Sequence, residues 1–314
     1  MNAVTTPSLN RFAARHHLAG LSPSSLAAVA TDQPGYSIDK AQRFLAFQQR
    51  IQQELLRHRV IIANPYTAWF RCGAQSGGQI KTFIVQFSVF SNLFLVAQLY
   101  KTINADSLEG MRASKEILAN EIGVVFNPGK ESARRQDKHT DPKLVSTEGT
   151  VEGGTFRFRA AHFEWLLRIA AKLGLGFNDV GKRRHGTSAT LFFCDELSRL
   201  YGNEDYEVSQ AASFAVENWA AAGFWKELIE GFEKFNTRSG ADLPLAFFTW
   251  HDRLESQHAR HTQEELEELY FHRTLDEDAF IRYGNEMLDG VAAFWDGLEA
   301  QRQELAAQSH QRAH

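Results

Sequence analysis

Three side chains of metal-ligand type recur at helical spacing near residue 250. His251, Glu255 and His258 occupy positions i, i+4 and i+7 of one continuous stretch. At about 100° per residue they fall within an arc of roughly 60° on one face of a helix. Two imidazoles and a carboxylate on one face suit iron or manganese, most often inside a helical bundle. A solvated polar helix face is the alternative for the same spacing, because residues 261–268 are strongly polar.

A site for two metal ions needs about six protein ligands, so other helices must supply more. Glu121 stands at an otherwise apolar helix end, and Glu217 is the only carboxylate of a strongly apolar stretch. His162 shares a face with Leu166 and Ile169, so it points inward. Burial of a carboxylate is costly unless it is paired or bound to a metal. Each residue also has an ordinary interpretation: a helix-end residue, an ion-pair partner and a hydrogen-bonded core histidine.

Composition excludes several other classes of function. The chain has 314 residues, 43% of them hydrophobic, and a net charge of -4, which gives no basic field for nucleic acid. No run of eighteen apolar residues occurs, so we expect neither a membrane span nor a secretory signal. Cys72 and Cys194 lack the spacing of a thiolate metal site or a disulfide framework. We therefore expect a cytoplasmic protein that binds no nucleic acid and no membrane.

Helical periodicity dominates the chain and predicts an all-α protein of about eight or nine helices. Residues 1–38 are expected to form a loosely structured arm with one short helix near 24–30, and residues 39–307 a helical bundle. The polar segment at about 129–156 is too long for an ordinary connection, so it is expected to be an insertion, with a small hairpin within 143–159. The expected helices span about 39–62, 79–104, 107–125, 158–174, 187–202, 205–222, 223–236, 243–271 and 276–307.

Four motifs follow one another in a recognisable order. They are Asn120-Glu121-Ile122-Gly123, the stretch from Ala161 to Leu167 that contains His162, Phe214-Ala215-Val216-Glu217, and the His251, Glu255 and His258 spacing. In this order the chain resembles the haem-oxygenase-like di-iron oxidase and oxygenase family over about residues 40–300. Relatives of that family include TenA-type thiaminases, PqqC-type cofactorless oxidases and para-aminobenzoate synthases that sacrifice one of their own side chains.

The resemblance implies a set of six metal ligands. Two features depart from the family's pattern. The family's first glutamate and its histidine usually lie about two turns apart on one helix, whereas here residues 129–155 separate them. Glu255 stands where the family often has aspartate, so the second iron could be held more loosely. Carried over by position, the ligands are Glu121, His162, Glu217, His251, Glu255 and His258.

The resemblance further implies an oxidoreductase that uses two Fe²⁺ ions, with dioxygen as co-substrate. We expect it to act on a small amino-acid-derived or amine-containing metabolite in natural product biosynthesis, by N-oxygenation, desaturation or C–C cleavage. Gln86, Tyr100 and Arg112 are candidates for orienting this substrate. The alternatives are a cofactorless oxidase or a hydrolase of the same fold, and a non-catalytic helical binding protein. Assembly as a homodimer is left open.

Overall fold

The computed structural model describes residues 6–126, 156–158 and 162–312. It gives the backbone but not the side chains of residues 6–7, 109, 120, 124–126, 156–158, 254–261 and 308–312. Its π-helical turns are η1 (Ile51–Leu55) and η4 (Leu197–Tyr201), its 3-10 turns are η2 (Phe177–Asp179) and η3 (Arg183–His185), and its strands are β1 (Val124–Phe126) and β2 (Phe156–Phe158). The α-helices are α1 (Thr6–His16), α2 (Pro23–Ala30), α3 (Ile38–Arg50), α4 (Arg59–Ile62), α5 (Pro65–Phe70), α6 (Gly77–Ile103), α7 (Leu108–Ile122), α8 (His162–Lys172), α9 (Ser188–Glu196), α10 (Tyr206–Ala220), α11 (Phe224–Ser239), α12 (Ala246–His272) and α13 (Glu277–Arg312).

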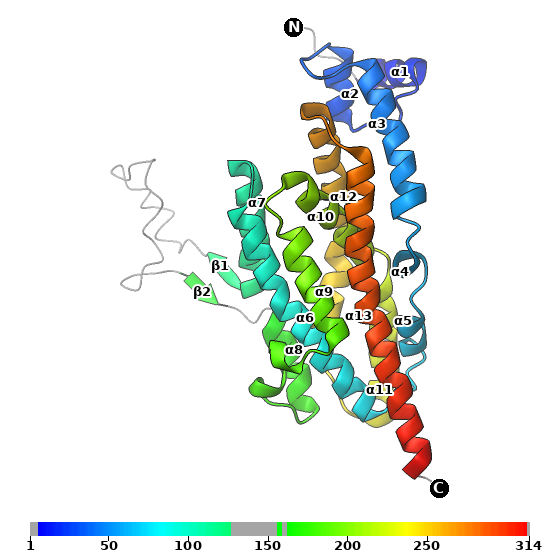
Figure 1. Ribbon diagram of the computed structural model, residues 1–314, viewed down its shortest axis with the longest axis vertical. Coiled ribbons are helices and arrows are strands. Elements are labelled where there is room, and N and C mark those ends of the chain that lie inside the picture. The colour runs from blue at the N-terminus through cyan, green and yellow to red at the C-terminus, as the bar shows by residue number, and fades with distance from the viewer. Residues whose placement is uncertain (1–5, 127–155, 159–161, 313–314) are drawn as a thin grey trace, which may run out of the picture.

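The described part of the chain is an all-α bundle with one two-stranded hairpin, as the helical periodicity predicted. The long helices α6, α12 and α13 run along the long axis of the molecule (Figure 1), and α10 packs against both α12 and α13. The expected aromatic stripe of α6 provides much of the core. The ring of Phe87 lies 5.8 Å from that of Phe248 and 6.1 Å from that of Phe294, so one side chain joins three helices.

Helix α6 is also long and apolar enough to cross a membrane, by length and composition only. In the bundle, 44% of its most apolar window is buried, and Phe83 and Phe87 have no solvent exposure. Its last two turns differ, because Val96, Leu99, Tyr100 and Ile103 are exposed there. The N-terminal two thirds of α6 thus form a core helix of this bundle.

Within residues 6–38 the chain is more regular than the sequence suggested. Besides α2, which corresponds to the short helix expected near 24–30, it forms α1, and Leu18, Leu26 and Val29 belong to the main hydrophobic cluster. Ser22 caps α2 by accepting a hydrogen bond from the backbone N–H of Ser25, and its own hydroxyl donates to Glu267 of α12 at 2.7 Å. This region therefore packs onto the bundle instead of forming a loose arm.

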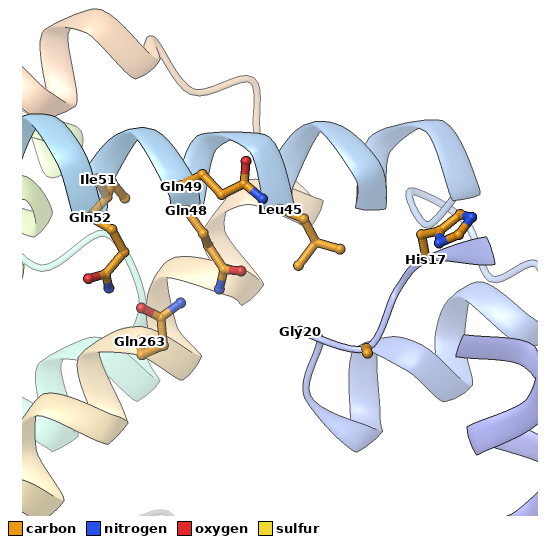
Figure 2. A pocket seen from close by; sticks show the side chains of 9 residues that line it. His17, Gly20, Leu45, Gln48, Gln49, Ile51, Gln52 and Gln263 are labelled. Atoms are coloured by element: carbon orange, nitrogen blue, oxygen red, sulfur yellow. The ribbon is translucent and has the colours of Figure 1, made fainter. Parts of the chain in front are cut away.

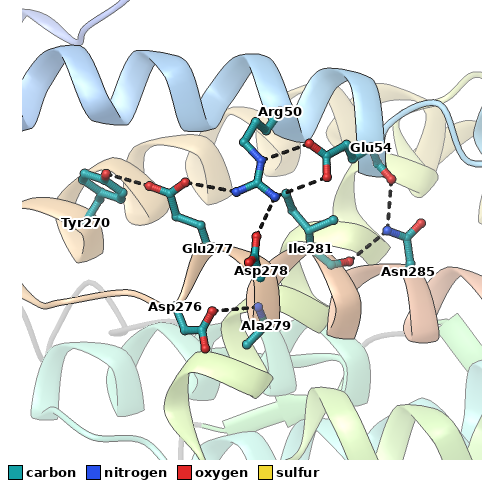
Figure 3. A network of polar contacts seen from close by, with 9 residues as sticks. All are labelled: Arg50, Glu54, Tyr270, Asp276, Glu277, Asp278, Ala279, Ile281 and Asn285. Atoms are coloured by element: carbon teal, nitrogen blue, oxygen red, sulfur yellow. Dashed lines mark hydrogen bonds and ion pairs between the residues drawn. The ribbon is translucent and has the colours of Figure 1, made fainter.

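The helix expected at 39–62 is interrupted. It consists of α3, the π-turn η1 and the short helix α4, which begins only at Arg59. Arg50, at the end of α3, donates to Glu54 of η1 and to Glu277 and Asp278 of α13, and Figure 3 shows these contacts. The network connects the end of α3 to the start of α13.

The insertion expected at 129–156 lies largely outside the described residues, but its two ends are described. β1 and β2 pair antiparallel, with Val124 opposite Phe158 and Phe126 opposite Phe156. The second strand of this hairpin falls within the range expected for a hairpin, but its partner strand precedes the insertion. The pairing brings the end of α7 next to the start of α8, although 39 residues lie between Ile122 and His162 in the chain.

Candidate metal centre

Glu121 and His162 meet where α7 ends and α8 begins. Gly123, with φ of 73°, turns the chain from α7 into β1, a backbone conformation that glycine adopts without strain. The hairpin then returns the chain to α8, whose first residue is His162. The Nδ1–H of His162 donates to Oε2 of Glu121 at 2.6 Å. The structure thus brings together two predicted ligands that residues 129–155 separate in the sequence.

His251 reaches the same place from α12. Its ring centroid lies 4.7 Å from that of His162, and it stacks on the ring of Trp225 of α11 at 4.7 Å. Its Nδ1 lies 2.6 Å from the carbonyl oxygen of Phe247. Because a carbonyl oxygen can only accept, Nδ1 carries the proton, and the lone pair of the neutral ring is on Nε2.

The two imidazoles therefore share one tautomer. In each ring, Nδ1 is bound to an oxygen acceptor and Nε2 carries the lone pair. The Nε2 atom of His162 is buried and has no hydrogen-bond partner in the described structure. The residue as a whole is only 3% exposed. Buried polar atoms are nearly always satisfied by protein, water or an ion, so Nε2 of His162 has room in its bonding for a further partner, as have seven other buried side-chain atoms of the described structure.

Aromatic rings surround His162 on the remaining sides. Its ring centroid lies 4.7 Å from Trp250, 5.7 Å from Trp165 and 5.9 Å from Phe247. Apolar rings keep water away and lower the local dielectric constant, which strengthens any electrostatic interaction at Nε2. The environment thus favours a cation bound directly by the side chains.

Glu217 lies on α10 and is partly buried rather than fully buried as its apolar neighbours suggested. Burial raises the pKa of Tyr201 well above its usual range, and the negative charges of Glu217, Glu265 and Glu121 raise it further. The charges of Glu217 on α10 and of Glu121 on α7 thus both raise the pKa of this buried tyrosine.

The last two predicted ligands, Glu255 and His258, lie outside the described side chains. The backbone of α12 is continuous from Ala246 to His272, so the spacing of these residues on the face of His251 is retained. Among the side chains that the structure describes, no three His, Cys, Asp or Glu residues are close enough to hold a metal ion. In the described part of the site, His162 contacts Glu121 on one side and His251 on the other, and the six-ligand set stays a prediction.

The residues suggested for orienting a substrate are not suited to that role. Gln86 is buried, donates to the carbonyl of His185 and accepts hydrogen bonds from Thr187 and Thr190, so both polar atoms of its amide have partners within the chain. Tyr100 and Arg112 are exposed. A polar residue on an apolar helix can serve internal hydrogen bonding, and the sequence alone does not separate that role from a binding role.

Lys101, the residue after Tyr100 in α6, reaches further into the bundle than Tyr100 does. It is the only charged residue between Thr82 and Ile103, and this sequence signal could have identified it. Its Nζ donates to the hydroxyl of Ser213 at 2.5 Å and lies 4.4 Å from the ring centroid of Tyr201. Desolvation lowers the pKa of Lys101, partly opposed by the charges of Glu265 and Glu217. Lys101 thus contacts α10 one helical turn before Glu217.

A surface pocket of about 700 Å³ lies elsewhere, and Figure 2 shows the residues around it. Gln48 and Gln52 line it from one side, Gln263 of α12 from another, and His17 and Gly20 from the N-terminal segment. None of the six predicted ligands lines this pocket. It is therefore separate from the candidate metal centre.

The two cysteines lie in different surroundings. Cys194 is buried, and desolvation raises the pKa of its thiol to about 12, so it stays protonated at neutral pH. Cys72 is exposed just beyond α5, and its thiol contacts the carbonyl of Ala68.

No protein-family model and no curated protein sequence matches the chain. A function for this protein is therefore inferred from the residues around His162.

Proposed function

We propose that this protein is a non-haem di-iron enzyme with a haem-oxygenase-like bundle that uses dioxygen to oxidise a small amino-acid-derived or amine-containing metabolite. The observation that carries the proposal is the buried, unpartnered Nε2 of His162, next to the ring of His251. A neutral imidazole with Nδ1 bound to an oxygen and Nε2 directed at an ion is the usual form of a metal-ligating histidine. The proposed ligands are Glu121, His162, Glu217, His251, Glu255 and His258.

The chemistry of the donor set supports iron. Imidazole nitrogen and carboxylate oxygen together suit Fe²⁺, and no thiolate stands among the described residues of the site. When bound, two ferrous ions would supply the electrons and the open coordination positions that activation of dioxygen needs. Glutamates suit such a pair, because a carboxylate can bind through one oxygen or two as the charge of the metal changes.

The chain's own residues fix the geometry and exclude water. Glu121 holds the Nδ1 proton of His162, and the carbonyl of Phe247 holds that of His251, so both rings are fixed in orientation and tautomer. The rings of Trp225 and Trp250 pack against the imidazoles. A dry, rigid surrounding of this kind protects a reactive oxidant from water.

Metal loading tests the proposal. The full-length protein is incubated with Fe²⁺ without oxygen, freed of unbound metal and analysed for iron, and then exposed to oxygen while oxygen uptake is recorded. We expect roughly two iron ions per chain and rapid oxygen uptake. Less than one iron per chain would contradict the di-iron assignment. Oxygen uptake that is equally fast in metal-free protein would favour the cofactorless oxidase.

A further inference from the structure

Tryptophan rings lead from His251 into the bundle. Trp225 of α11 stacks on His251, with 4.7 Å between the ring centroids and 22° between the ring planes. The ring of Phe224 lies 4.4 Å from that of Trp225 and 5.5 Å from that of Trp295 of α13. Both indoles are buried. One phenylalanine ring thus separates the tryptophan beside the candidate metal centre from a second tryptophan on another helix.

The same series of rings reaches the surface at α5, which packs against α11 and α13 (Figure 1). The ring of Trp295 lies 5.8 Å from that of Tyr66, and the ring of Tyr66 lies 5.3 Å from that of Trp69. Trp69 is only partly buried, and the backbone N–H of the exposed Cys72 donates to its carbonyl. Three tryptophans on three helices, with one aromatic ring between neighbours, therefore connect the candidate centre to solvent. We call Trp69, Trp295 and Trp225 the tryptophan path.

The two buried indoles of this path have unpaired N–H groups. Nε1 of Trp225 and Nε1 of Trp295 meet no hydrogen-bond partner in the part of the chain that the structure describes. Stability alone favours phenylalanine at such positions, because a buried N–H without an acceptor is destabilising. Indole, however, gives up one electron far more readily than a phenyl ring does. Without an acceptor for its proton, an oxidised indole stays a radical cation and regains an electron without any proton transfer.

Tyr66 and Phe224 serve as bridges between the tryptophans. A phenyl ring is too hard to oxidise to hold the missing electron itself. A phenol is oxidised readily only when it releases its proton, and burial raises the pKa of Tyr66 well above its usual value. Electron tunnelling weakens steeply with distance, and a single ring in contact with both neighbours keeps each distance between indoles short. Electrons therefore pass from indole to indole across these two rings.

We propose that the tryptophan path conducts single electrons from a one-electron donor at the surface of α5 to an oxidised group bound at His251. Trp225 gives one electron to that group, and each indole cation is then reduced by the next tryptophan toward the surface, until the donor reduces Trp69. No bond or proton changes place, and the donor loses the electron that the bound group gains. That these electrons serve the oxidation of a substrate rests on the proposed function, whereas conduction along the indoles does not require iron.

A photosensitiser attached to Cys72 tests the path. Cys72 is exposed and Cys194 is buried, so a thiol-reactive ruthenium polypyridyl complex labels Cys72 alone. In full-length protein without metal or oxygen, a laser flash and a sacrificial electron acceptor turn this label into a one-electron oxidant beside Trp69. Electrons then leave along the same path in the opposite direction. Transient absorption distinguishes the radical cation of a buried indole from the neutral radical that a partly exposed indole forms when it loses its proton to water.

Trp295→Phe interrupts the path. Trp219→Phe is the matched control, because Trp219 is a buried tryptophan that also contacts Phe224 but does not belong to the path. We expect the radical cation in wild type and in Trp219→Phe, and only the neutral radical in Trp295→Phe. Equal cation yields in wild type and Trp295→Phe, loss of the cation in Trp219→Phe, or no cation in wild type would overturn the proposal.

The position of the label replaces the variant if Trp295→Phe does not fold. Glu204→Cys in Cys72→Ser protein carries the label at an exposed site before α10. The 15 residues of α10 place this site about 20 Å from Trp219 and the rings around Phe224. The label should produce no indole radical cation from there. A cation yield equal to that from Cys72 would refute conduction along the path.

Iron-loaded protein tests the inner end of the path. In wild type that holds roughly two ferrous ions per chain without oxygen, the metal should reduce the cation and shorten its lifetime. Trp225→Phe should remove this shortening, because Trp225 is the ring that contacts His251. An unchanged lifetime in loaded wild type would refute the connection to His251. If the cation requires Trp295 but less than one iron binds per chain, the electron path stands and the di-iron function fails.

Discussion

Two buried polar side chains of the bundle, Gln86 and His162, differ in what their polar atoms meet. Gln86 of α6 donates to the carbonyl of His185 at 2.8 Å, and its Oε1 accepts from Thr187 N–H at 2.9 Å and from the Thr190 hydroxyl at 2.7 Å. Each polar atom of its amide has a partner. Gln86 thereby connects α6 to the segment before α9, which is a structural role.

His162 is as deeply buried but satisfied on one side only. Its Nδ1 is bound to Glu121, and its Nε2 meets no hydrogen-bond partner in the described structure. Under the proposed function, this difference separates a polar group that holds the fold together from one that binds a metal ion. Both polar atoms of the Gln86 amide have partners within the chain, and Nε2 of His162 lacks one where apolar rings exclude water.

The largest expected effect is on stability at Gln86. Gln86→Leu leaves the carbonyl of His185, the N–H of Thr187 and the hydroxyl of Thr190 without their partner. We expect the free energy of unfolding to fall by about 3 kcal/mol, since each buried group left unpaired costs about 1–3 kcal/mol and some relax toward water. Chemical denaturation measures this change. Iron content should equal that of wild type. A parallel loss of iron would show that the roles of Gln86 and His162 are not separate.

Glu121→Gln should affect metal affinity more than stability. The amide keeps the size of the side chain but no longer provides an anionic partner for the Nδ1–H of His162. Loss of such a partner commonly weakens metal binding 10–100-fold, about 1.4–2.7 kcal/mol, and because Glu121 is also a proposed ligand we expect a loss of at least this size. Competition with a colorimetric Fe²⁺ chelator measures the change. An unaltered iron affinity would show that Glu121 only terminates α7.

Lys101 differs from Gln86 and His162 in carrying a charge, so its effect on stability depends on pH. Desolvation lowers its pKa below the value of about 10.4 in the unfolded chain. Between the two values the unfolded chain binds more protons, so wild-type stability rises with pH there. Lys101→Met should therefore be more stable than wild type at neutral pH, and this advantage should shrink as pH approaches about 10.4.

Denaturation of both proteins from neutral pH upward measures this trend, with Lys81→Met as the control for an exposed lysine. An advantage of Lys101→Met that stays constant over the whole range would show that Lys101 is not titrated at a lowered pKa in the folded protein. A smaller stability than wild type at neutral pH would show that its ammonium is already well paired.

The smallest effect is expected at Arg50, whose partners Glu54, Glu277 and Asp278 are already in place. The network is largely solvent-exposed, and exposed ion pairs contribute little because water and salt screen them. Arg50→Ala should lower the melting temperature by at most about 2 °C, and high salt should remove most of the difference. A large loss of stability that salt does not change would show that Arg50 also packs tightly against α13.

Local patterns predicted the long helices well, because their apolar residues repeat at helical spacing. The helices expected at 79–104 and 243–271 correspond to α6 and α12 to within three residues at each end. The break between Leu55 and Arg59 was not visible, since the sequence there stays compatible with a helix. The pairing of 124–126 with 156–158 was also missed, because contacts across an insertion leave no local periodicity.

The site was predictable in part for the same reason. Spacing and an apolar face identified His162 as inward-facing, and the structure confirms its burial. The contact of His162 with Glu121 comes from tertiary structure, and neither spacing nor composition encodes it. Gln86 was misjudged because a sequence shows that a residue is polar but not which groups satisfy it. Lys101 was overlooked although it is an isolated charge in an apolar helix.

The central claim is tested most directly by the iron content of wild type and of His162→Leu. Both proteins are loaded with Fe²⁺ side by side without oxygen and freed of unbound metal. The leucine side chain fills a similar volume but has no nitrogen. If Nε2 of His162 is a metal ligand, wild type holds roughly two iron ions per chain and the variant at most one. Equal iron content in the two proteins, or less than one iron per chain in wild type, would contradict the account.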